Sequence, residues 1–414
     1  MASKFSAPKG TFDVLPPESA RYEALIALFA EHAQRYGFGL IVQPMFEDIG
    51  VFQRVGASTD VVRKEMYDFE DKGGRKIALR PEGTAQTARA FLEHHPTPPW
   101  KVWYVGPKFR YDRPQKGRYR QHHEVGVEAI GTSDADADVE VISLADGFYR
   151  ALGLTKLRMR LTSLGDQVCR PPYRAELEAY LNQRRDQLCP EHTDRIAENP
   201  LRVLDCKRDA CVAATKDAPH MVDRLCEDCA AHFARVRAGL DAAGIAYQLD
   251  PSLVRGLDYY TRTTFEFETP ALESAQNAAG GGGRYDGLIE QLGGQPTPGI
   301  GFGLGIERIL IACDAEGVFG LPEQTLDVFV IDTTGGDDAR DIARDLRAAG
   351  VRVDRAFDNR SFKSQLTAAL RSGARLAVAV EDAGITVRTL TEKGEPVAVD
   401  RANLVATLIE RLSS

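Results

Sequence analysis

Residues 105–128 read VGPKFRYDRPQKGRYRQHHEVGVE, and this stretch decides the fold. Two strand-like arms flank a polar loop at residues 111–118, which predicts a long antiparallel hairpin. The two-residue period of a strand places Glu124 and Glu128 on one face of the return arm. Residues 108–120 carry six Lys or Arg side chains against a single acid, Asp112. Such a face suits a ligand with a cationic group and a phosphate, and a solvated face with cross-strand ion pairs is the alternative.

A second segment with chemical character is GIGFGLGIERIL at residues 299–310. Its glycines fall on alternate positions, which leaves one strand face bare, so that a flat ring fits against the backbone. Arg308 falls in the first turn of the following helix, where anions bind favourably. Neither the Walker-loop pattern nor the dinucleotide-binding glycine spacing is present. The segment therefore predicts a nucleotide site of another kind, and a close-packed strand pair is the alternative.

Composition limits the class of protein. The chain has 414 residues, of which 43% are hydrophobic and 27% charged, as in globular proteins of two or three domains. No run approaches the ~18 apolar residues of a membrane span, and the first residues lack the apolar core of a signal peptide, so we expect a cytoplasmic protein with no membrane partner. The net charge is -8, so any nucleic-acid or phosphate site must be a local basic patch.

The order of predicted elements divides the chain into two domains. Residues 1–325 begin with a helix that ends near Gly37 and continue with strands punctuated by Gly and Pro, which predicts an α+β domain around an antiparallel sheet. Charged helical periodicity from about residue 165 to 245 indicates a helical insertion. Residues 326–414 alternate strands and helices, which predicts a compact α/β domain with a partly parallel sheet.

Six of the seven cysteines are concentrated in the predicted insertion. CPEH at residues 189–192 and CEDC at residues 226–229 each place two metal-binding side chains three positions apart, and Cys206 and Cys211 lie between them. Four such ligands close a tetrahedral zinc site, so we consider a structural zinc held by Cys189, Cys206, Cys226 and Cys229. Buried reduced cysteines without a metal are the alternative.

These segments resemble motifs of class II aminoacyl-tRNA synthetases. The hairpin from Gly106 to Glu128 is similar to motif 2 of that class, and residues 301–310 are similar to motif 3. LVRGLDYYTRT at residues 253–263 resembles the segment that distinguishes the histidyl-tRNA synthetase family. KGTFDVLP at 9–16, RPEGT at 80–84 and GGRYDG at 282–287 resemble other segments of the same family. The resemblance covers nearly the whole chain and implies a class II catalytic domain followed by an anticodon-binding domain.

The resemblance also implies an ATP site. Arg110 would hold the α-phosphate and Arg308 the distal phosphates, with Gly303 and Gly305 beside the nucleotide and Mg2+ bridging phosphate oxygens. Arg255 would reach both the α-phosphate and the attacking carboxylate. Fixed guanidinium groups stabilise the negative charge that develops on phosphorus without reorganising, which agrees with these roles.

A histidine site follows from the same resemblance. It would consist of Glu82, Thr84, Glu124, Glu128, Tyr259, Tyr260 and Tyr285. Glu82 and Thr84 would receive the α-amino group, whereas Glu128 and the paired tyrosines would recognise the imidazole. The family usually has Gln in place of Glu124, and a second acid there would repel the substrate carboxylate unless it is protonated, paired with an Arg or turned away.

The remaining implied contacts are macromolecular. The hairpin loop, with Arg113, Gln115, Lys116 and Arg118, would contact the acceptor end of tRNA(His). The segment at residues 39–46 resembles the class motif that builds a homodimer. The implied reaction is the activation of L-histidine by ATP to histidyl-adenylate and its transfer to the 3′ end of the tRNA. A non-catalytic regulatory paralogue that binds histidine, and a class II enzyme for another amino acid, are the alternative functions.

Overall fold

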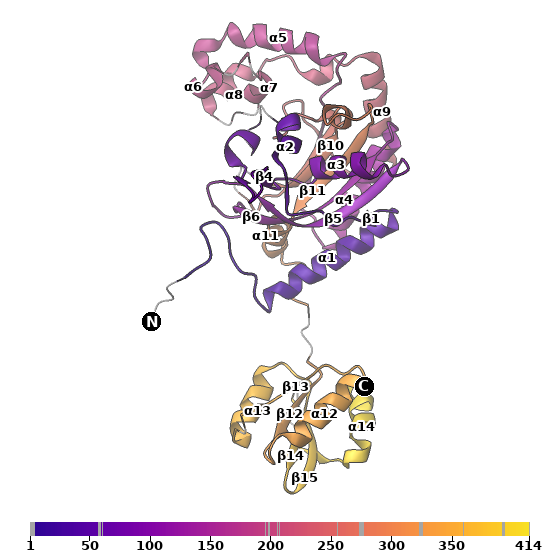
Figure 1. The fold of residues 1–414 in the computed structure, drawn as a ribbon. Coiled ribbons are helices and arrows are strands. Elements are labelled where there is room, and N and C mark those ends of the chain that lie inside the picture. The colour runs from indigo at the N-terminus through magenta and orange to yellow at the C-terminus, as the bar shows by residue number, and fades with distance from the viewer. Residues whose placement is uncertain are drawn as a thin grey trace. The chain divides into compact units, whose positions relative to one another are not determined.

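The computed structural model describes residues 5–413, apart from 57, 58, 60, 195, 198, 205, 207, 255, 273–276, 323–325, 359 and 391–393. The chain forms two compact units, residues 1–320 and residues 321–414 (Figure 1). No helix in the described part of the chain is long and apolar enough to cross a membrane.

An eight-stranded sheet organises the first unit. Its order is β1-β5-β6-β11-β10-β9-β7-β8. The strands are β1 (Gly39–Leu40), β5 (Trp100–Phe109), β6 (Gln121–Ile130), β7 (Arg158–Ser163), β8 (Gln248–Leu249), β9 (Thr261–Glu268), β10 (Ala278–Arg284) and β11 (Gly299–Gly305). Neighbouring strands pair antiparallel except β1 with β5 and β7 with β8, which are parallel. The predicted antiparallel sheet is confirmed.

The hairpin predicted from residues 105–128 forms the second and third strands of this sheet. β5 and β6 pair along their whole length, with Gly106 opposite Glu124 and Val102 opposite Glu128. β6 then pairs with β11, so that Glu124 lies opposite Gly305 and Glu128 opposite Gly301. The two segments that the sequence marked as chemically distinctive are therefore neighbouring strands, although about 170 residues separate them along the chain.

Helices cover both faces of the sheet (Figure 1). One core contains the apolar faces of α1 (Glu18–Arg35), α4 (Ala135–Ala151), α9 (Glu227–Ala242) and α11 (Ile306–Glu316). A second core lies with α2 (Ile49–Gly56), the π-helix η1 (Val61–Glu65), α3 (Thr84–His94), α10 (Leu288–Gln291) and a small sheet of order β2-β4-β3, with β2 (Phe46–Asp48), β3 (Asp68–Glu70) and β4 (Lys76–Leu79). The first helix ends as predicted, because Gly37 adopts a φ of +79°, which favours glycine.

A buried ion pair joins β10 to α4. The Arg284 guanidinium is fully buried and lies 2.6 Å from a carboxylate oxygen of Asp138. It also donates hydrogen bonds to the carbonyls of Thr132 and Asp134 and contacts Asp286 at 3.2 Å. Because both charges are paired and hydrogen-bonded, the pair holds the turn after β10 in place without an uncompensated charge.

The helical insertion begins after β7. It contains α5 (Arg170–Asn182), η2 (Arg185–Gln187), α6 (Pro190–Thr193), α7 (Leu201–Leu204), α8 (Asp209–Thr215), η3 (Met221–Asp223) and the start of α9. A core of its own packs Tyr173, Leu177 and Leu181 of α5 against buried cysteines. This core is distinct from that of the main sheet, although Leu225 packs against both.

The second unit is a five-stranded sheet with helices. The strand order is β13-β12-β14-β15-β16, and the first three strands are parallel. The elements are β12 (Val328–Asp332), α12 (Asp337–Ala348), β13 (Val353–Arg355), α13 (Phe362–Arg371), β14 (Leu376–Glu381), β15 (Gly384–Thr389), β16 (Val397–Ala398), η5 (Arg401–Asn403) and α14 (Leu404–Ser413). The alternation predicted from residue 326 onward is confirmed, including the partly parallel sheet.

Candidate active site

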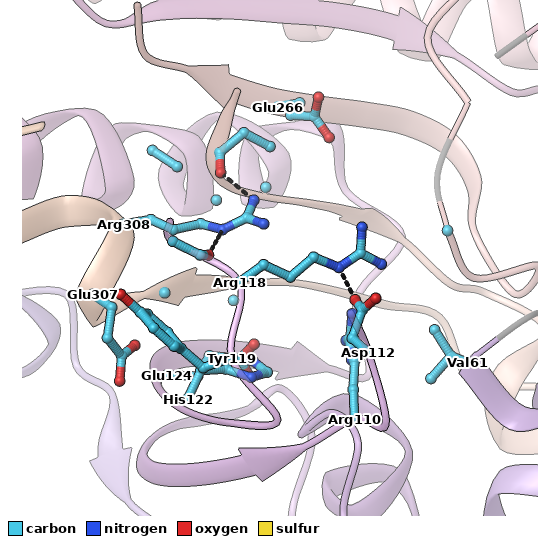
Figure 2. A pocket seen from close by; sticks show the side chains of 18 of the residues that line it. Val61, Arg110, Asp112, Arg118, Tyr119, His122, Glu124, Glu266, Glu307 and Arg308 are labelled. Carbon is cyan, nitrogen blue, oxygen red and sulfur yellow. Dashed lines mark hydrogen bonds and ion pairs between the residues drawn. The ribbon is translucent and has the colours of Figure 1, made fainter. Parts of the chain in front are cut away.

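A cavity of about 390 Å³ adjoins the β5–β6 hairpin and is shared with β9, β10, β11 and the start of α11 (Figure 2). Its wall includes seven of the residues predicted from the sequence, Arg110, Arg118, Glu124, Tyr260, Gly303, Gly305 and Arg308. Gly256 and Leu257 also line it, whereas Arg255 lies outside the described residues. We refer to this space as the basic cavity.

Arg308 occupies the first turn of α11, as the sequence predicts. Its Nε donates to the carbonyl of Gly117 at 2.8 Å and its Nη1 to the carbonyl of Ala278 at 2.7 Å. Burial, together with the charges of Arg118 and Arg110, lowers the pKa of Arg308 to about 10. The carbonyl acceptors orient the guanidinium but do not neutralise it, so Arg308 is a positioned cation in the cavity wall.

Two further arginines of the hairpin line the cavity. Arg110 donates from Nε to the carbonyl of Pro81 at 2.9 Å. Arg118 forms an ion pair with Asp112 (Figure 2). It also lies 3.4 Å from a carboxylate oxygen of Glu65. Arg118 therefore lines the cavity, whereas the family resemblance implied a contact with the tRNA.

The loop itself turns tightly beyond the cavity. Gln115 and Arg118 exchange backbone hydrogen bonds of 3.1 and 2.9 Å, and Gly117 between them has a φ of +73°. Arg113, Gln115 and Lys116 are exposed and do not line the basic cavity. Their side chains are accessible to a large partner.

Glu124 has a cationic neighbour. The Lys108 ammonium is fully buried, 3.9 Å from Glu124 Oε1 and 4.5 Å from the centre of the Tyr104 ring. Burial lowers the pKa of Lys108 to about 8, and the Glu124 carboxylate opposes that shift. Of the possibilities considered for Glu124, pairing with a cation is the one present, and the cation is a lysine instead of an arginine.

Glu128 lies at the centre of a buried group that we call the tyrosine–carboxylate cluster, consisting of Glu82, Thr84, Tyr104, Glu128, Tyr259 and Tyr285. Thr84 Oγ1 and Tyr285 OH each lie 2.6 Å from a different carboxylate oxygen of Glu128, and Tyr104 OH lies at 3.3 Å. Burial raises the pKa of Glu128 to about 8, although the hydrogen bonds from Thr84 and Tyr285 act in the opposite direction. A neutral, protonated Glu128 is therefore favoured near pH 7.

Glu82 performs a local structural task in the same cluster. Its carboxylate accepts hydrogen bonds from the backbone N–H groups of Thr84 and Ala85 at 2.6 and 2.9 Å, at the start of α3. Tyr259 OH donates to it at 3.3 Å. The ring of Tyr259 lies 4.8 Å from that of Tyr260, which lines the basic cavity, so the cluster and the cavity are neighbours.

The glycines of β11 are required by these carboxylates. A Cβ on Gly301 would lie 1.9 Å from Glu128 Oε2, and one on Gly303 would lie 2.7 Å from the carboxyl carbon of Glu124. Tyr285 covers Gly299 in the same way. The bare strand face predicted from the sequence is therefore partly filled by side chains of this chain, and it borders the cavity at Gly303 and Gly305.

The cysteines of the insertion differ from the predicted grouping. Among the described residues, potential metal-binding atoms form two groups, Cys189, His192, Cys206 and Cys211 in one and Asp166, Cys169, Cys226 and Cys229 in the other. The predicted set of Cys189, Cys206, Cys226 and Cys229 is divided equally between them. Each three-residue spacing found in the sequence is used, but the two spacings do not converge on one centre.

Comparison with known proteins identifies the family. Residues 10–309 match the family model described as histidyl-tRNA synthetase, and residues 327–411 match the anticodon binding domain. The chain is 50% identical to "Histidine--tRNA ligase" of Rhodococcus erythropolis over 97% of each chain. The chain belongs to the histidyl-tRNA synthetase family. It is also 48% identical to the protein of the same name from Mycobacterium tuberculosis, over 99% of each chain.

Solved structures agree with membership of the histidyl-tRNA synthetase family. The apo histidyl-tRNA synthetase of S. aureus superposes with a TM-score of 0.82 at 34% identity, covering 98% of this chain and 99% of that one. A Bacillus halodurans structure titled as an ATP phosphoribosyltransferase regulatory subunit/histidyl-tRNA synthetase has a TM-score of 0.62 at 23% identity and covers 86% of this chain and 93% of that one. The latter likeness concerns the fold alone.

Lys108 and Tyr104, which contact the predicted carboxylates, and Glu266, which lines the cavity, were not predicted from the sequence as site residues. Lys108 was counted in the basic stretch but was given no role, and Tyr104 was not considered. The sequence does contain a signal for Lys108. It lies two positions before Arg110, and therefore on the same face, in a strand whose other residues are mostly apolar. No sequence pattern indicates that Tyr104 reaches Glu128, since that contact depends on how β5 and β6 twist together.

Proposed function

We propose that this chain is a histidine–tRNA ligase that activates L-histidine with ATP and transfers it to the 3′ end of tRNA(His). One observation carries the proposal. A cavity lined by positioned arginines borders a buried tyrosine–carboxylate cluster, with Tyr260 at their junction. A polyanionic nucleotide and a small cationic or aromatic amino acid therefore have adjacent sites. The names of the full-length relatives support the same reaction.

In the first step the histidine carboxylate attacks the α-phosphate of ATP. Arg110 and Arg308 are the cations that would hold the phosphates, because backbone carbonyls fix their guanidinium groups before the ligand binds. Negative charge increases at the phosphoryl oxygens in the transition state, and fixed cations stabilise it without reorganisation. Arg255 is assigned to the same charge on family resemblance, and its neighbours Gly256 and Leu257 line the cavity.

Magnesium fits the donor set of this cavity. Glu124 and Glu266 line it and offer carboxylate oxygens, the ligand type that Mg2+ prefers together with phosphate oxygens. When bound with ATP, the ion would neutralise part of the phosphate charge. Gly303 and Gly305, which also line the cavity, leave room beside the nucleotide.

Histidine recognition is assigned to the tyrosine–carboxylate cluster. Glu128 accepts two short hydrogen bonds inside the cluster and has a raised pKa, so it can exchange a partner or a proton with an imidazole nitrogen. Tyr259, Tyr260 and Tyr285 supply the aromatic walls. Glu82 and Thr84 are assigned to the α-amino group. The backbone N–H of Thr84 now donates to Glu82, and Thr84 Oγ1 donates to Glu128. The α-ammonium of the substrate would replace these donors or join them.

In the second step a ribose hydroxyl of the tRNA attacks the activated carbonyl. Arg113, Gln115 and Lys116 extend from the exposed hairpin loop and are assigned to the acceptor end, as two cations and an amide suited to phosphate and base contacts. The second unit is assigned to the anticodon. A hollow beside α13 is lined by four cations and two acids, so positive charge predominates, and Ser361 and Ser364 add hydroxyl groups; the charged residues are Arg355, Arg360, Lys363, Arg371, Asp354 and Asp358.

A homodimer is part of the proposal. Leu40, Val42, Met45 and Phe46 have exposed fractions between 53 and 85%, and they follow one another along the segment that begins with β1. β1 is an edge of the eight-stranded sheet. An exposed apolar run at a sheet edge favours a second copy as its partner.

The experiment that tests the function is ATP–pyrophosphate exchange with each proteinogenic amino acid, followed by charging of tRNA(His). We expect exchange with histidine and charging of that tRNA. A regulatory paralogue would bind histidine without supporting exchange. Exchange with a different amino acid would contradict the assignment of the tyrosine–carboxylate cluster to an imidazole.

A further inference from the structure

The helical insertion contains two compact groups of metal-binding side chains that the ligase reaction does not use. The first group is Cys189, His192, Cys206 and Cys211, and the second is Asp166, Cys169, Cys226 and Cys229. In each group one donor atom per residue lies within 4.8 Å of every other. Six of the seven cysteines of the chain belong to these groups, and none is in a disulfide.

We propose that the insertion binds two zinc ions, one in each group, with three thiolates and His192 around the first ion and three thiolates and Asp166 around the second. Zn–S bonds of about 2.3 Å at tetrahedral angles separate the sulfurs by ~3.8 Å. The donors are spaced on this scale, all within 4.8 Å of one another in each group, with Cys226 Sγ 3.8 Å from Asp166 Oδ1. Cys189 Sγ lies 3.0 Å from His192 Nδ1, so these two atoms would move slightly apart around an ion.

The two groups share one local design. Cys189 is the residue before α6 and Cys226 the residue before α9, and the second donor follows three positions later in the first turn, as His192 or Cys229. Two residues thus lie between the donors of each pair, which is a common spacing of zinc ligands. A second pair completes each group from elsewhere in the insertion, by residues 206 and 211 or by residues 166 and 169.

Hydrogen bonds around the sulfurs support thiolates as the bound form. The backbone N–H of Cys189 donates to Cys211 Sγ at 3.2 Å, and the backbone N–H of Asp166 donates to Cys169 Sγ at 3.3 Å. Such outer contacts orient metal ligands. At Asp166, Oδ1 lies near Cys169 and Cys226, whereas Oδ2 is 3.3 Å from the Arg262 guanidinium, which balances part of the negative charge of that group.

The second site would secure the insertion to the catalytic sheet. Arg262 belongs to β9, and its backbone N–H donates to the carbonyl of Gly165 at 2.7 Å. Arg170, next to Cys169, donates to the carbonyl of Tyr260 at 2.9 Å. An ion at this group therefore connects the start of α9 with the junction beside the basic cavity. The first site lies within the insertion core, where Cys189 and Cys211 are buried.

The test is the zinc content of the full-length protein, purified under reducing conditions and measured by elemental analysis and native mass spectrometry. We expect two zinc ions per chain. Cys211→Ser should leave one ion, Cys229→Ser should leave one ion, and the double variant should leave none. The matched control is Cys313→Ser, which changes the buried cysteine of α11 that belongs to neither group and should retain both ions.

If a variant fails to fold, the zinc content of the wild-type protein still decides whether the proposal holds. Substituting Co2+ into the wild type should give thiolate-to-metal absorption equivalent to three thiolates at each of two centres. Cys211→His, which keeps a ligand, should retain two ions with a changed cobalt spectrum. One zinc ion or none per wild-type chain, loss of zinc in Cys313→Ser, or disulfides detected by intact mass in the reduced protein would overturn the proposal.

Discussion

The basic cavity and the tyrosine–carboxylate cluster are adjacent but are prepared in opposite ways. In the cavity, Arg110 and Arg308 are fixed by neutral carbonyls and keep their charge. In the cluster, Glu128 is surrounded by hydroxyl donors, and burial favours its neutral form. We therefore expect the cavity to bind a ligand with many negative charges and the cluster to exchange hydrogen bonds with a small polar ligand.

This difference predicts which free energy each region controls. Positioned cations act most strongly where charge increases during the reaction, so changes in the cavity should affect the rate of activation. The cluster combines stability and recognition, because its polar atoms bind one another before any ligand arrives. Changes in the cluster should alter both the free energy of unfolding and the affinity for histidine.

The largest effect is expected for Arg308→Gln. Removing one fixed donor to developing negative charge costs ~10²–10³ in rate, or about 2.7–4 kcal/mol. Pyrophosphate exchange should fall by that factor, while histidine binding measured by calorimetry without ATP should change little. Arg35→Gln, on the exposed surface of α1, is the matched control. Loss of histidine binding to the same extent as exchange would remove the distinction between the two regions.

A smaller effect is expected for the pair Lys108 and Glu124, which lies between the two regions. Glu124→Gln leaves the buried ammonium without its nearest counter-charge, and breaking a buried pair is strongly destabilising. Lys108→Met together with Glu124→Gln removes both charges at similar volume. We expect the double variant to recover ~1–3 kcal/mol relative to the sum of the single variants in urea unfolding. Additive effects would mean that the 3.9 Å separation carries no coupling.

Glu128→Gln tests the cluster through pH. In the folded protein the pKa of Glu128 is about 8, above its ordinary value of 4.5. Between these values the folded state holds one proton more, so this group makes stability fall as pH rises, by at most ~1.4 kcal/mol per unit. The stability of the wild type minus that of Glu128→Gln should therefore decline from pH 5 to 8 in urea unfolding. A difference that is constant with pH would contradict the raised pKa, and Glu23→Gln on the surface of α1 is the control.

The sequence predicted the fold where the pattern is local. The hairpin at residues 105–128 and the alternation of strands and helices from residue 326 were expected, and both are present. In contrast, strand β7 was not anticipated, although it connects the main sheet to the insertion. Hydrophobic periodicity indicates that a segment is a strand but does not indicate its partner, and pairing across the chain is decided by packing.

The same distinction between local pattern and packing across the chain applies to the site. Arg308 was placed in its helix turn from local spacing alone, and the structure puts it there. The division of the cysteines between two groups could not be predicted, because their spacing is local but their convergence depends on how α5, α8 and α9 pack. The pairing of Lys108 with Glu124 likewise needs the register of β5 and β6, in which Lys108 lies opposite His122 and Gly106 opposite Glu124.

The smallest effect is expected at the rim of the cavity, where Arg113 and Lys116 are exposed in the hairpin loop. Replacing both by Ala should leave pyrophosphate exchange unchanged, because neither side chain lines the cavity. If both contact phosphates of a double-helical acceptor stem, the slope of log affinity against log salt should become shallower by ~0.9 for each of the two lost contacts.

Arg118→Ala is the informative contrast. Arg118 lines the cavity and pairs with Asp112, so its loss should lower exchange as well as tRNA charging. Lys72→Ala, in another exposed loop, is the control for charge alone. Equal losses of exchange for the Arg113 and Lys116 double variant and for Arg118→Ala would show that the loop shapes the cavity as one unit. Arg113 and Lys116 would then contribute to the ATP site, and their assignment to tRNA binding alone would be wrong.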